Sequence, residues 1–463
     1  MKRPLHRRPA ASVRRRGDAA GIAARRAALG ILRRVDEEGA FADVLLGHQL
    51  GAFPLADRRL ITLLVLGGLA WQGRLDYEIE RLAGRPADEL DSAVLAILRL
   101  GLFQLRFMDR VPGHAAVDTA VEIAKQNPRT RQAGGLVNAV LRRASSSSIE
   151  LPERDRDEAG YLSVAWSHPR WLVESFIAWF GLAEAESLMA ADNEAAPNVI
   201  RLNLARGSRA ALLERLRADG LAFDDEQQGL PETVVLQGAA GLGGDSPEGL
   251  FCTQSEASQW IARLLAPAPG ATVIDCAAAP GGKSTHLAEL VGEGGRVLAL
   301  DVNLSGLKRL RMRAAALGDR NLEVACADLA NAIPLRASQF DFVLLDAPCT
   351  GLGTLREHPE IRWRLEPGDP ARLAELQLRM LAAAAALLRP GGALVYSVCS
   401  LAPAEGIEVV RNFLARHPGF AIDAAPRVHP AIARELRADA TMLTRPDRGG
   451  RDGFFAARII RSR

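Results

Sequence analysis

The chain has 463 residues, of which 48% are hydrophobic and 24% are charged, and its net charge is +3. This length predicts about three domains, and the composition is that of a globular protein rather than a fibrous or largely disordered one. The chain has no uncharged apolar run of the roughly 18 residues needed to span a membrane, and no apolar segment follows the N-terminal arginines, so we expect neither a transmembrane helix nor a secretory signal.

The N-terminal segment 1–34 is strongly basic. It contains eleven Lys and Arg residues and one acid, Asp18, so it carries +10 while the rest of the chain carries −7. We expect residues 1–20 to form a basic, disordered arm. Such an arm either binds phosphate groups or remains a solvated tail.

Residues 21–145 have the pattern of an all-helical bundle. Apolar residues share one helical face from about Arg25 onward, and apolar helical stretches separated by Gly, Pro or Asp are expected over 60–71, 93–107, 115–125 and 135–143. The four serines at 145–148 predict a linker. We assign residues 146–240 to this linker and a small α/β module, with strands expected over 199–203 and 233–236 and a helix over 208–220.

Strand and helix patterns alternate over residues 241–463. Strands are expected over 272–276, 296–301, 322–326, 340–346 and 393–398, and helices over 283–290, 305–317 and 371–388. Apolar strands that alternate with helices are typical of a buried parallel sheet with helices on both faces. Ligands of such sheets bind beyond the carboxyl ends of the strands. The residues that follow each strand are therefore the first candidates for a functional site.

A glycine-rich turn follows the first of these strands. The turn consists of Ala277, Ala278, Ala279, Pro280, Gly281, Gly282 and Lys283. Its small residues let the backbone approach a ligand, and the helix N-terminus after it favours an anionic group. The next three strands end at or just before Asp301, Asp328 and Asp346. We expect these acids and the turn to form one ligand site, in which Asp301 stands where an acid commonly binds ribose hydroxyls.

Two classes of ligand compete for this turn. The segment 277–284 is close to the phosphate-binding pattern G-x-x-x-x-G-K-[ST] of nucleotide hydrolases, but Ala277 replaces its first glycine. Carboxylates at Asp301 and Asp328 would also repel a triphosphate. They suit a ligand that has a sugar, an adenine amine and a cationic centre. The sequence therefore favours S-adenosylmethionine as the cofactor.

The five cysteines are Cys252, Cys276, Cys326, Cys349 and Cys399. Because they form no C-x-x-C and no zinc-binding spacing, we expect no disulfide framework, no metal site and a reducing, cytoplasmic setting. Cys349 and Cys399 each follow the end of a predicted strand, so both thiols should reach the site at the glycine-rich turn. The other three cysteines are expected to pack in the interior.

A thiolate beside a methyl donor suits methylation of carbon 5 of a pyrimidine. The thiolate adds to carbon 6, carbon 5 attacks the methyl group, and a base then removes the carbon 5 proton before the thiol leaves. The target base must be unstacked to reach such a site. Asp346 can supply or hold a proton near the ring nitrogen. These residues alone leave open whether Cys349 or Cys399 attacks.

Several motifs resemble those of the bacterial RsmB family, also called Sun or Fmu, whose members make 5-methylcytosine in 16S ribosomal RNA. The motifs are Ser167–Leu172, Asp346–Gly351, His358–Trp363, Tyr396–Ser400 and Asp452–Phe455, together with the glycine-rich turn. The resemblance covers nearly the whole chain. It implies a NusB-like RNA-binding domain over 21–145 and a class I, Rossmann-like methyltransferase domain over 241–463. Cys276 stands one place before the family's usual cysteine position, which Ala277 occupies.

The resemblance also implies roles for individual residues. The family's nucleophile lies in the later cysteine motif, here Cys399, and Cys349 is taken to assist product release. The S-adenosylmethionine site carries over to 277–283, Asp301, Asp328 and Asp346. Lys283 either steadies the donor or Asp346, or only begins the helix.

The expected partner is 16S ribosomal RNA, bound by a monomer without a metal or a membrane. Cations and an aromatic ring at Arg356, His358, Arg362, Trp363 and Arg364 suit RNA phosphates and bases, although a solvated loop is an alternative for Arg356 and Arg364. A tRNA cytosine methyltransferase is an alternative enzyme. A non-catalytic RNA-binding protein is a third hypothesis, which the intact cysteine motifs and glycine-rich turn disfavour.

Overall fold

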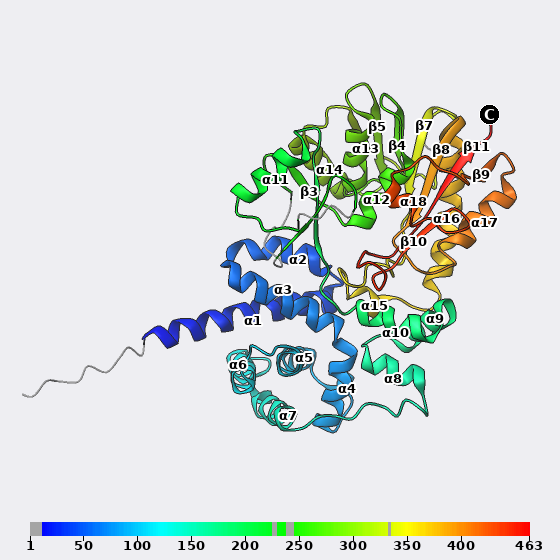
Figure 1. Cartoon of the computed structure of the whole chain (residues 1–463). Coiled ribbons are helices and arrows are strands. Elements are labelled where there is room, and N and C mark those ends of the chain that lie inside the picture. Colours follow the sequence, from blue (N-terminus) through cyan, green and yellow to red (C-terminus); the bar gives the residue numbers. More distant parts are fainter. Residues whose placement is uncertain (1–11, 225–228, 238–244, 332–334) are drawn as a thin grey trace, which may run out of the picture. The chain divides into compact units, whose positions relative to one another are not determined.

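The computed structural model describes residues 12–224, 229–237, 245–331 and 335–463 (Figure 1). The chain folds into two compact units, Met1–Arg170 and Trp171–Arg463. The disorder expected for residues 1–11 lies outside the described residues. Residues 12–20 were also expected to be disordered, and this was wrong, because helix α1 begins at Ser12.

The first unit is a helical bundle, as the periodicity of residues 21–145 predicts. Its helices are α1 (Ser12–Glu38), α2 (Ala42–Gln49), α3 (Leu55–Ala70), α4 (Gln72–Ala83), α5 (Ser92–Phe107), α6 (Gly113–Gln126), α7 (Gly134–Ser146) and α8 (Glu158–Ala165), with short 3₁₀ turns at Leu50–Ala52, Ala87–Glu89 and Arg131–Ala133. Asp91 caps α5 by accepting hydrogen bonds from the backbone N–H groups of Ala93 and Val94. Helix α5 is buried on most of its surface and contacts α1, α3, α4, α6 and α7, so it is the central helix of the bundle.

The second unit begins with a small α/β module. Its elements are α9 (Arg170–Phe180), α10 (Leu182–Ala191), β1 (Asn198–Leu202), α11 (Arg209–Ala218), β2 (Thr233–Leu236) and β3 (Phe251–Thr253). The strands form an antiparallel sheet in the order β2-β1-β3. Strands β1 and β2 and helix α11 were predicted. Strand β3 was not, because three residues are too few to show an alternation of apolar and polar side chains.

The large sheet of the second unit has eight strands. They are β4 (Thr272–Asp275), β5 (Arg296–Asp301), β6 (Leu322–Cys326), β7 (Phe340–Asp346), β8 (Leu388–Val398), β9 (Phe420–Ile422), β10 (Thr441–Thr444) and β11 (Phe454–Arg461). The order is β10-β11-β8-β7-β4-β5-β6, and β9 pairs with β11. The run β8-β7-β4-β5-β6 is parallel, as predicted. Strand β11 is antiparallel to β8, β9 and β10, so the sheet is mixed rather than wholly parallel.

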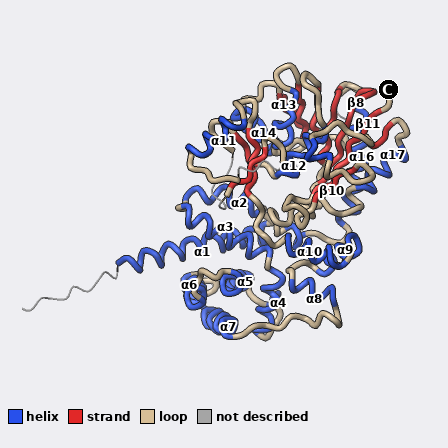
Figure 2. Tube along the Cα trace, viewed as in Figure 1, coloured by secondary structure: helices blue, strands red, loops and turns tan. Residues whose placement is uncertain are grey.

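Helices cover both faces of this sheet (Figure 2). They are α12 (Glu256–Leu265), α13 (Gly282–Val291), α14 (Leu304–Leu317), α16 (Asp369–Leu387) and α17 (Ile407–Arg416), and the shorter α15 (Ile361–Arg364) and α18 (Pro430–Ala433) lie in loops. Leu344 of β7 packs with residues of α12 and α13, whereas its neighbours Val343 and Leu345 pack with residues of α16 and α17. This alternation explains why the strands are apolar along their whole length. Among the described residues, every helix is too short or too polar to cross a membrane.

The parallel strands bring their carboxyl ends to one edge of the sheet. Asp346 of β7 stands opposite Ser397 of β8, and Asp275 of β4 stands opposite Leu344 of β7. The glycine-rich turn follows β4, and the two cysteine motifs follow β7 and β8. The fold therefore collects these segments at the same edge, where parallel sheets bind ligands.

Candidate active site

The glycine-rich turn connects β4 to α13 in a conformation that requires glycine at position 281. Gly281 has a φ of 109°, and a Cβ atom there would lie 2.6 Å from Cγ of Leu310. Both the left-handed backbone and the close approach of α14 exclude a larger side chain. The turn thus packs tightly against α14, and Lys283 lies in the first turn of α13.

Lys283 and Asp346 form an ion pair at the edge of the sheet. Nζ of Lys283 donates a hydrogen bond to Oδ2 of Asp346 at 2.8 Å, and the hydroxyl of Ser397 donates to Oδ1 at 2.7 Å. Burial lowers the pKa of Lys283, but the Asp346 carboxylate outweighs burial, so the net effect is a raised pKa. Lys283 is therefore a charged side chain that joins the turn to the ends of β7 and β8.

Two of the predicted cofactor-binding acids accept hydrogen bonds from loop backbone. Oδ2 of Asp301 accepts from the N–H of Ala279 in the turn at 2.9 Å, and Oδ1 accepts from the N–H of Asn303 at 2.7 Å. Asp301 thus fixes the turn against the end of β5. Asp328 is exposed, and its hydrogen bonds are to Ala330 and Asn331 of its own loop.

Asp275 faces the interior of the protein instead of the edge. It is 1% exposed, and Oδ2 accepts a hydrogen bond from the Ser284 hydroxyl at 2.6 Å. Burial raises the pKa of Asp275 to about 7. Its position links the end of β4 to α13, so it supports the turn from behind.

The two cysteines after β7 and β8 lie in contact. The Sγ atoms of Cys349 and Cys399 are 3.2 Å apart, and both side chains are partly buried free thiols. The hydrogen bond with Cys399 and burial raise the pKa of Cys349 well above its usual range. Cys349 is therefore kept as a thiol.

The remaining cysteines differ from this pair. Cys252 and Cys276 are buried, and burial raises the pKa of both thiols. Cys326 is exposed, which contradicts the expectation that it packs in the interior. It is the last residue of β6, which is an edge strand of the sheet.

Two arginines expected to contact RNA are buried instead. Arg356 and Arg362 each donate a hydrogen bond to the segment that follows α10. Arg362 donates to Oδ1 of Asn193 at 2.8 Å, and Arg356 donates to the carbonyl of Ala195 at 2.9 Å. The RNA-contact hypothesis is wrong for these two side chains, and so is the solvated-loop alternative for Arg356. Arg364 is exposed, so its contact with RNA stays a prediction.

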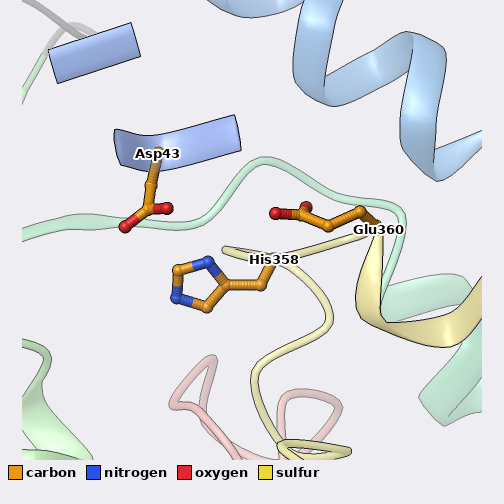
Figure 3. A group of neighbouring side chains, drawn as sticks. All are labelled: Asp43, His358 and Glu360. Carbon is orange, nitrogen blue, oxygen red and sulfur yellow. The ribbon is translucent and has the colours of Figure 1, made fainter. Parts of the chain in front are cut away.

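His358 and Glu360 belong to the same loop (Figure 3). Glu360 immediately precedes α15 and is 2% exposed, and His358 is partly buried. The backbone N–H of His358 donates to the carbonyl of Thr354, and its own carbonyl accepts from Ile361. This compact turn supports the start of α15.

Glu405 and Gln377 were not among the residues predicted for the site. Both are fully buried and contact the loops that carry the cysteines. A glutamate in a stretch of small and apolar residues, Leu401–Ile407, was the available signal, because an acid in such a segment is buried only when it has partners.

Three family profiles together match most of the chain. The family described as "16S rRNA methyltransferase RsmB/F" matches residues 262–460. The "NusB family" matches residues 22–146, and the ferredoxin-like domain of RsmF/B-like methyltransferases matches residues 168–242.

Two relatives and a solved structure match this chain over nearly its whole length. "Ribosomal RNA small subunit methyltransferase B" of Thermus thermophilus is 37% identical, over 94% of this chain and 96% of its own. "Probable ribosomal RNA small subunit methyltransferase B" of Synechocystis is 35% identical, over 95% of this chain and 99% of its own. The crystal structure of a protein named PH0851 superposes with a TM-score of 0.81 at 27% identity, covering 95% of this chain and 99% of that one. The chain belongs to the RsmB/F family of ribosomal RNA methyltransferases.

Proposed function

We propose that this protein methylates carbon 5 of a cytosine in 16S ribosomal RNA and that Cys399 is the nucleophile. The observation that carries the proposal is the 3.2 Å separation of the Cys349 and Cys399 sulfurs at the ends of neighbouring parallel strands. Covalent catalysis at carbon 6 needs a thiolate, and the removal of a proton from carbon 5 needs a second group close to it. Two thiols in contact satisfy both needs.

S-adenosylmethionine is the methyl donor of this family, and the edge of the sheet fits it. Each oxygen of Asp301 accepts one hydrogen bond in the structure, so each retains a lone pair for a ribose hydroxyl. The small residues of the turn leave its backbone open to close approach, and the carboxylates suit a cationic centre. When bound, S-adenosylmethionine supplies an electrophilic methyl group.

We assign the two sulfurs different roles. Cys349, whose pKa is raised, remains a thiol, and Cys399 takes the role of the attacking sulfur. Sγ of Cys399 forms a bond to carbon 6 of the cytosine, and carbon 5 thereby becomes nucleophilic. As charge develops on the ring nitrogen, Asp346 passes a proton to it from the hydrogen-bonded Lys283 ammonium, and this proton returns to Lys283 when the product is released.

Release of the product reverses the covalent step. The Cys349 thiol donates its proton to the departing Cys399 sulfur, and the Cys349 thiolate so formed takes the proton from carbon 5. The carbon 5–carbon 6 double bond reforms and the bond between Cys399 and carbon 6 breaks. The Cys399 thiol then loses its proton to solvent, which restores the starting state. This sequence calls for no metal ion, and we propose that a monomer performs it in the cytoplasm, where free cysteines persist.

The proposal is tested with 16S ribosomal RNA transcribed from cytidine that carries tritium at carbon 5. Methylation at carbon 5 releases this tritium into water, and methylation at any other atom does not. We expect release that depends on S-adenosylmethionine and on 16S RNA. Methyl transfer without tritium release would contradict methylation at carbon 5. Tritium release from labelled tRNA but not from 16S RNA would contradict 16S ribosomal RNA as the substrate.

A further inference from the structure

Glu405 is a carboxylate buried in the turn between β8 and α17. Its side chain is completely shielded from solvent. A buried carboxylate is unfavourable unless hydrogen-bond donors surround it. The residues that donate these hydrogen bonds therefore show which segments of the chain Glu405 connects.

The donors to Glu405 are the residues that directly follow the two cysteines. Oε1 accepts from the backbone N–H of Thr350 at 2.9 Å, and Oε2 accepts from the hydroxyl of Ser400 at 2.5 Å. The Thr350 hydroxyl also bonds to Oε2 and lies 3.0 Å from the Ser400 hydroxyl. Thr350 follows Cys349 and Ser400 follows Cys399, so one carboxylate connects both cysteine loops.

The surrounding scaffold fixes Glu405 itself. Nε2 of Gln377, on α16, donates to Oε1 of Glu405 at 3.0 Å and to the carbonyl of Pro348 at 2.9 Å. The Tyr396 hydroxyl of β8 donates to the backbone carbonyl of Glu405 at 2.5 Å. With Gln377 included, both oxygens of the carboxylate accept two hydrogen bonds each, which is their full capacity. Helix α16 and strand β8 therefore fix Glu405, which in turn connects the two cysteine loops.

We propose that Glu405 is a positioning residue for the two-cysteine site, fixing the loops after β7 and β8 so that the two sulfurs stay in contact. Its part in methylation rests on the proposed function above, because only that reaction uses both thiols. Misplacement of a reacting group by about 1 Å can lower a rate on the order of a hundredfold. Loss of this connection should therefore reduce turnover more than binding.

The charge of Glu405 gives the proposal a second consequence. After the hydrogen bond with Cys399 and burial, the Glu405 carboxylate is a further contributor to the raised pKa of Cys349. Removal of that charge should lower the pKa of the Cys349 thiol. This effect can be measured on the protein alone, in the absence of RNA.

Glu405→Gln is the sharpest variant, and Glu408→Gln is its matched control. Glutamine keeps the volume of the side chain but loses the charge and one acceptor. Glu408 lies three residues later, in the first turn of α17, and is exposed. We expect Glu405→Gln to lower kcat for tritium release on the order of tenfold. KM for RNA and the Kd for S-adenosylmethionine should stay within about twofold of the native values, as should all parameters of Glu408→Gln.

Alkylation of the thiols with iodoacetamide, followed by mass spectrometry across a pH series, supplies the second measurement. In Glu405→Gln the half-maximal pH for Cys349 alkylation should fall, and in Glu408→Gln it should not. If Glu405→Gln fails to fold, Thr350→Val and Ser400→Ala each remove one hydroxyl donor to the carboxylate, and each should lower kcat with little change in KM.

The outcomes separate this proposal from the proposed function. If the native protein releases no tritium from 16S RNA, the proposed function fails, while a shifted Cys349 alkylation profile in Glu405→Gln still supports positioning. A Glu405→Gln protein with native kcat and a native alkylation profile overturns the positioning role. A drop in thermal stability with unchanged kcat also overturns it, since that is the result of a purely structural residue.

Discussion

Lys283 donates a hydrogen bond to Asp346 at 2.8 Å, and this contact joins the glycine-rich turn after β4 to the end of β7. Because Asp346 also accepts from Ser397, which lies two residues before Cys399, the same carboxylate reaches the end of β8. The turn assigned to the methyl donor and the loop of the proposed nucleophile are thus separated by one charged side chain and one carboxylate. Their closeness is what a methyl transfer at the cysteine site requires.

Replacement of Cys399 by alanine should abolish methylation and leave binding of S-adenosylmethionine unchanged. The nucleophile disappears, whereas the turn and Asp301, which we assign to the donor, are untouched. Isothermal titration with S-adenosylmethionine and the tritium-release assay measure the two properties separately. Cys326→Ala, which alters an exposed cysteine at the end of β6, is the control and should keep native turnover. Full turnover by Cys399→Ala would remove that residue from the mechanism.

Replacement of Gly281 by alanine should weaken binding of S-adenosylmethionine on the order of tenfold or more. The new Cβ would lie only 2.6 Å from Leu310, and the alanine backbone would have to adopt a φ of 109°. The turn therefore has to move. Gly292→Ala is the matched control, because Gly292 also has a positive φ but has open space around it. Equal donor affinity in the two variants would show that the turn does not form the donor site.

The stability of the protein should depend on pH through Asp275. Burial raises its pKa from 3.8 to about 7, so between these values the native state holds a proton that the unfolded state has lost. This carboxyl therefore destabilises the fold increasingly as pH rises through that window, by up to about 4 kcal/mol above it.

Asp275→Asn should make the dependence of stability on pH weaker, since an amide does not titrate. Asp192 and Asp319, whose pKa values burial also raises to about 7, account for the dependence that remains. The measurement is the denaturant midpoint at a series of pH values, read as a slope because the amide adds a cost that is independent of pH. Asp155→Asn, at an exposed position, serves as the control. Parallel slopes for Asp275→Asn and the native protein would contradict the assignment of Asp275 as a neutral, buried acid.

The basic N-terminal segment should contribute affinity for RNA that depends on salt but not on sequence. Deletion of residues 1–11 removes Lys2, Arg3, Arg7 and Arg8. If all four contact phosphates, the slope of log Kobs against log salt concentration should become shallower by about 3. Filter binding at several salt concentrations, with 16S RNA and with an unrelated RNA, tests this. An unchanged slope would show that residues 1–11 do not contact the RNA phosphates.

Much of the sheet was predictable because its parallel strands are short, mostly apolar runs that alternate with helices. The expected bounds of β5, β6 and β7 agree with the structure. Strands β10 and β11 were missed because no helix separates them, so the strand–helix alternation that identified the other strands is absent there, and β9 was missed because it has only three residues.

The site could be predicted only where strand ends determine it. The turn, Asp346 and the two cysteine motifs follow strands directly, and the parallel pairing brings them together. Glu405 and Arg362 could not be placed, because their environments come from partners far along the chain. Glu405 meets Thr350, 55 residues earlier, and Arg362 meets Asn193, 169 residues earlier. Only tertiary packing shows that Glu405 is buried among hydrogen-bond donors and that Arg362 is buried away from RNA.

The most direct test of the account is a covalent complex between Cys399 and RNA in the Cys349→Ser protein. Without the Cys349 thiol, addition to carbon 6 and methyl transfer proceed but release does not, so 16S RNA should remain attached to the protein. A denaturing gel of Cys349→Ser with 16S RNA and S-adenosylmethionine should show a slower band, which is absent in the Cys349→Ser, Cys399→Ser double variant. No such band, or a band that persists in the double variant, would contradict the claim that the Cys399 sulfur attacks the cytosine.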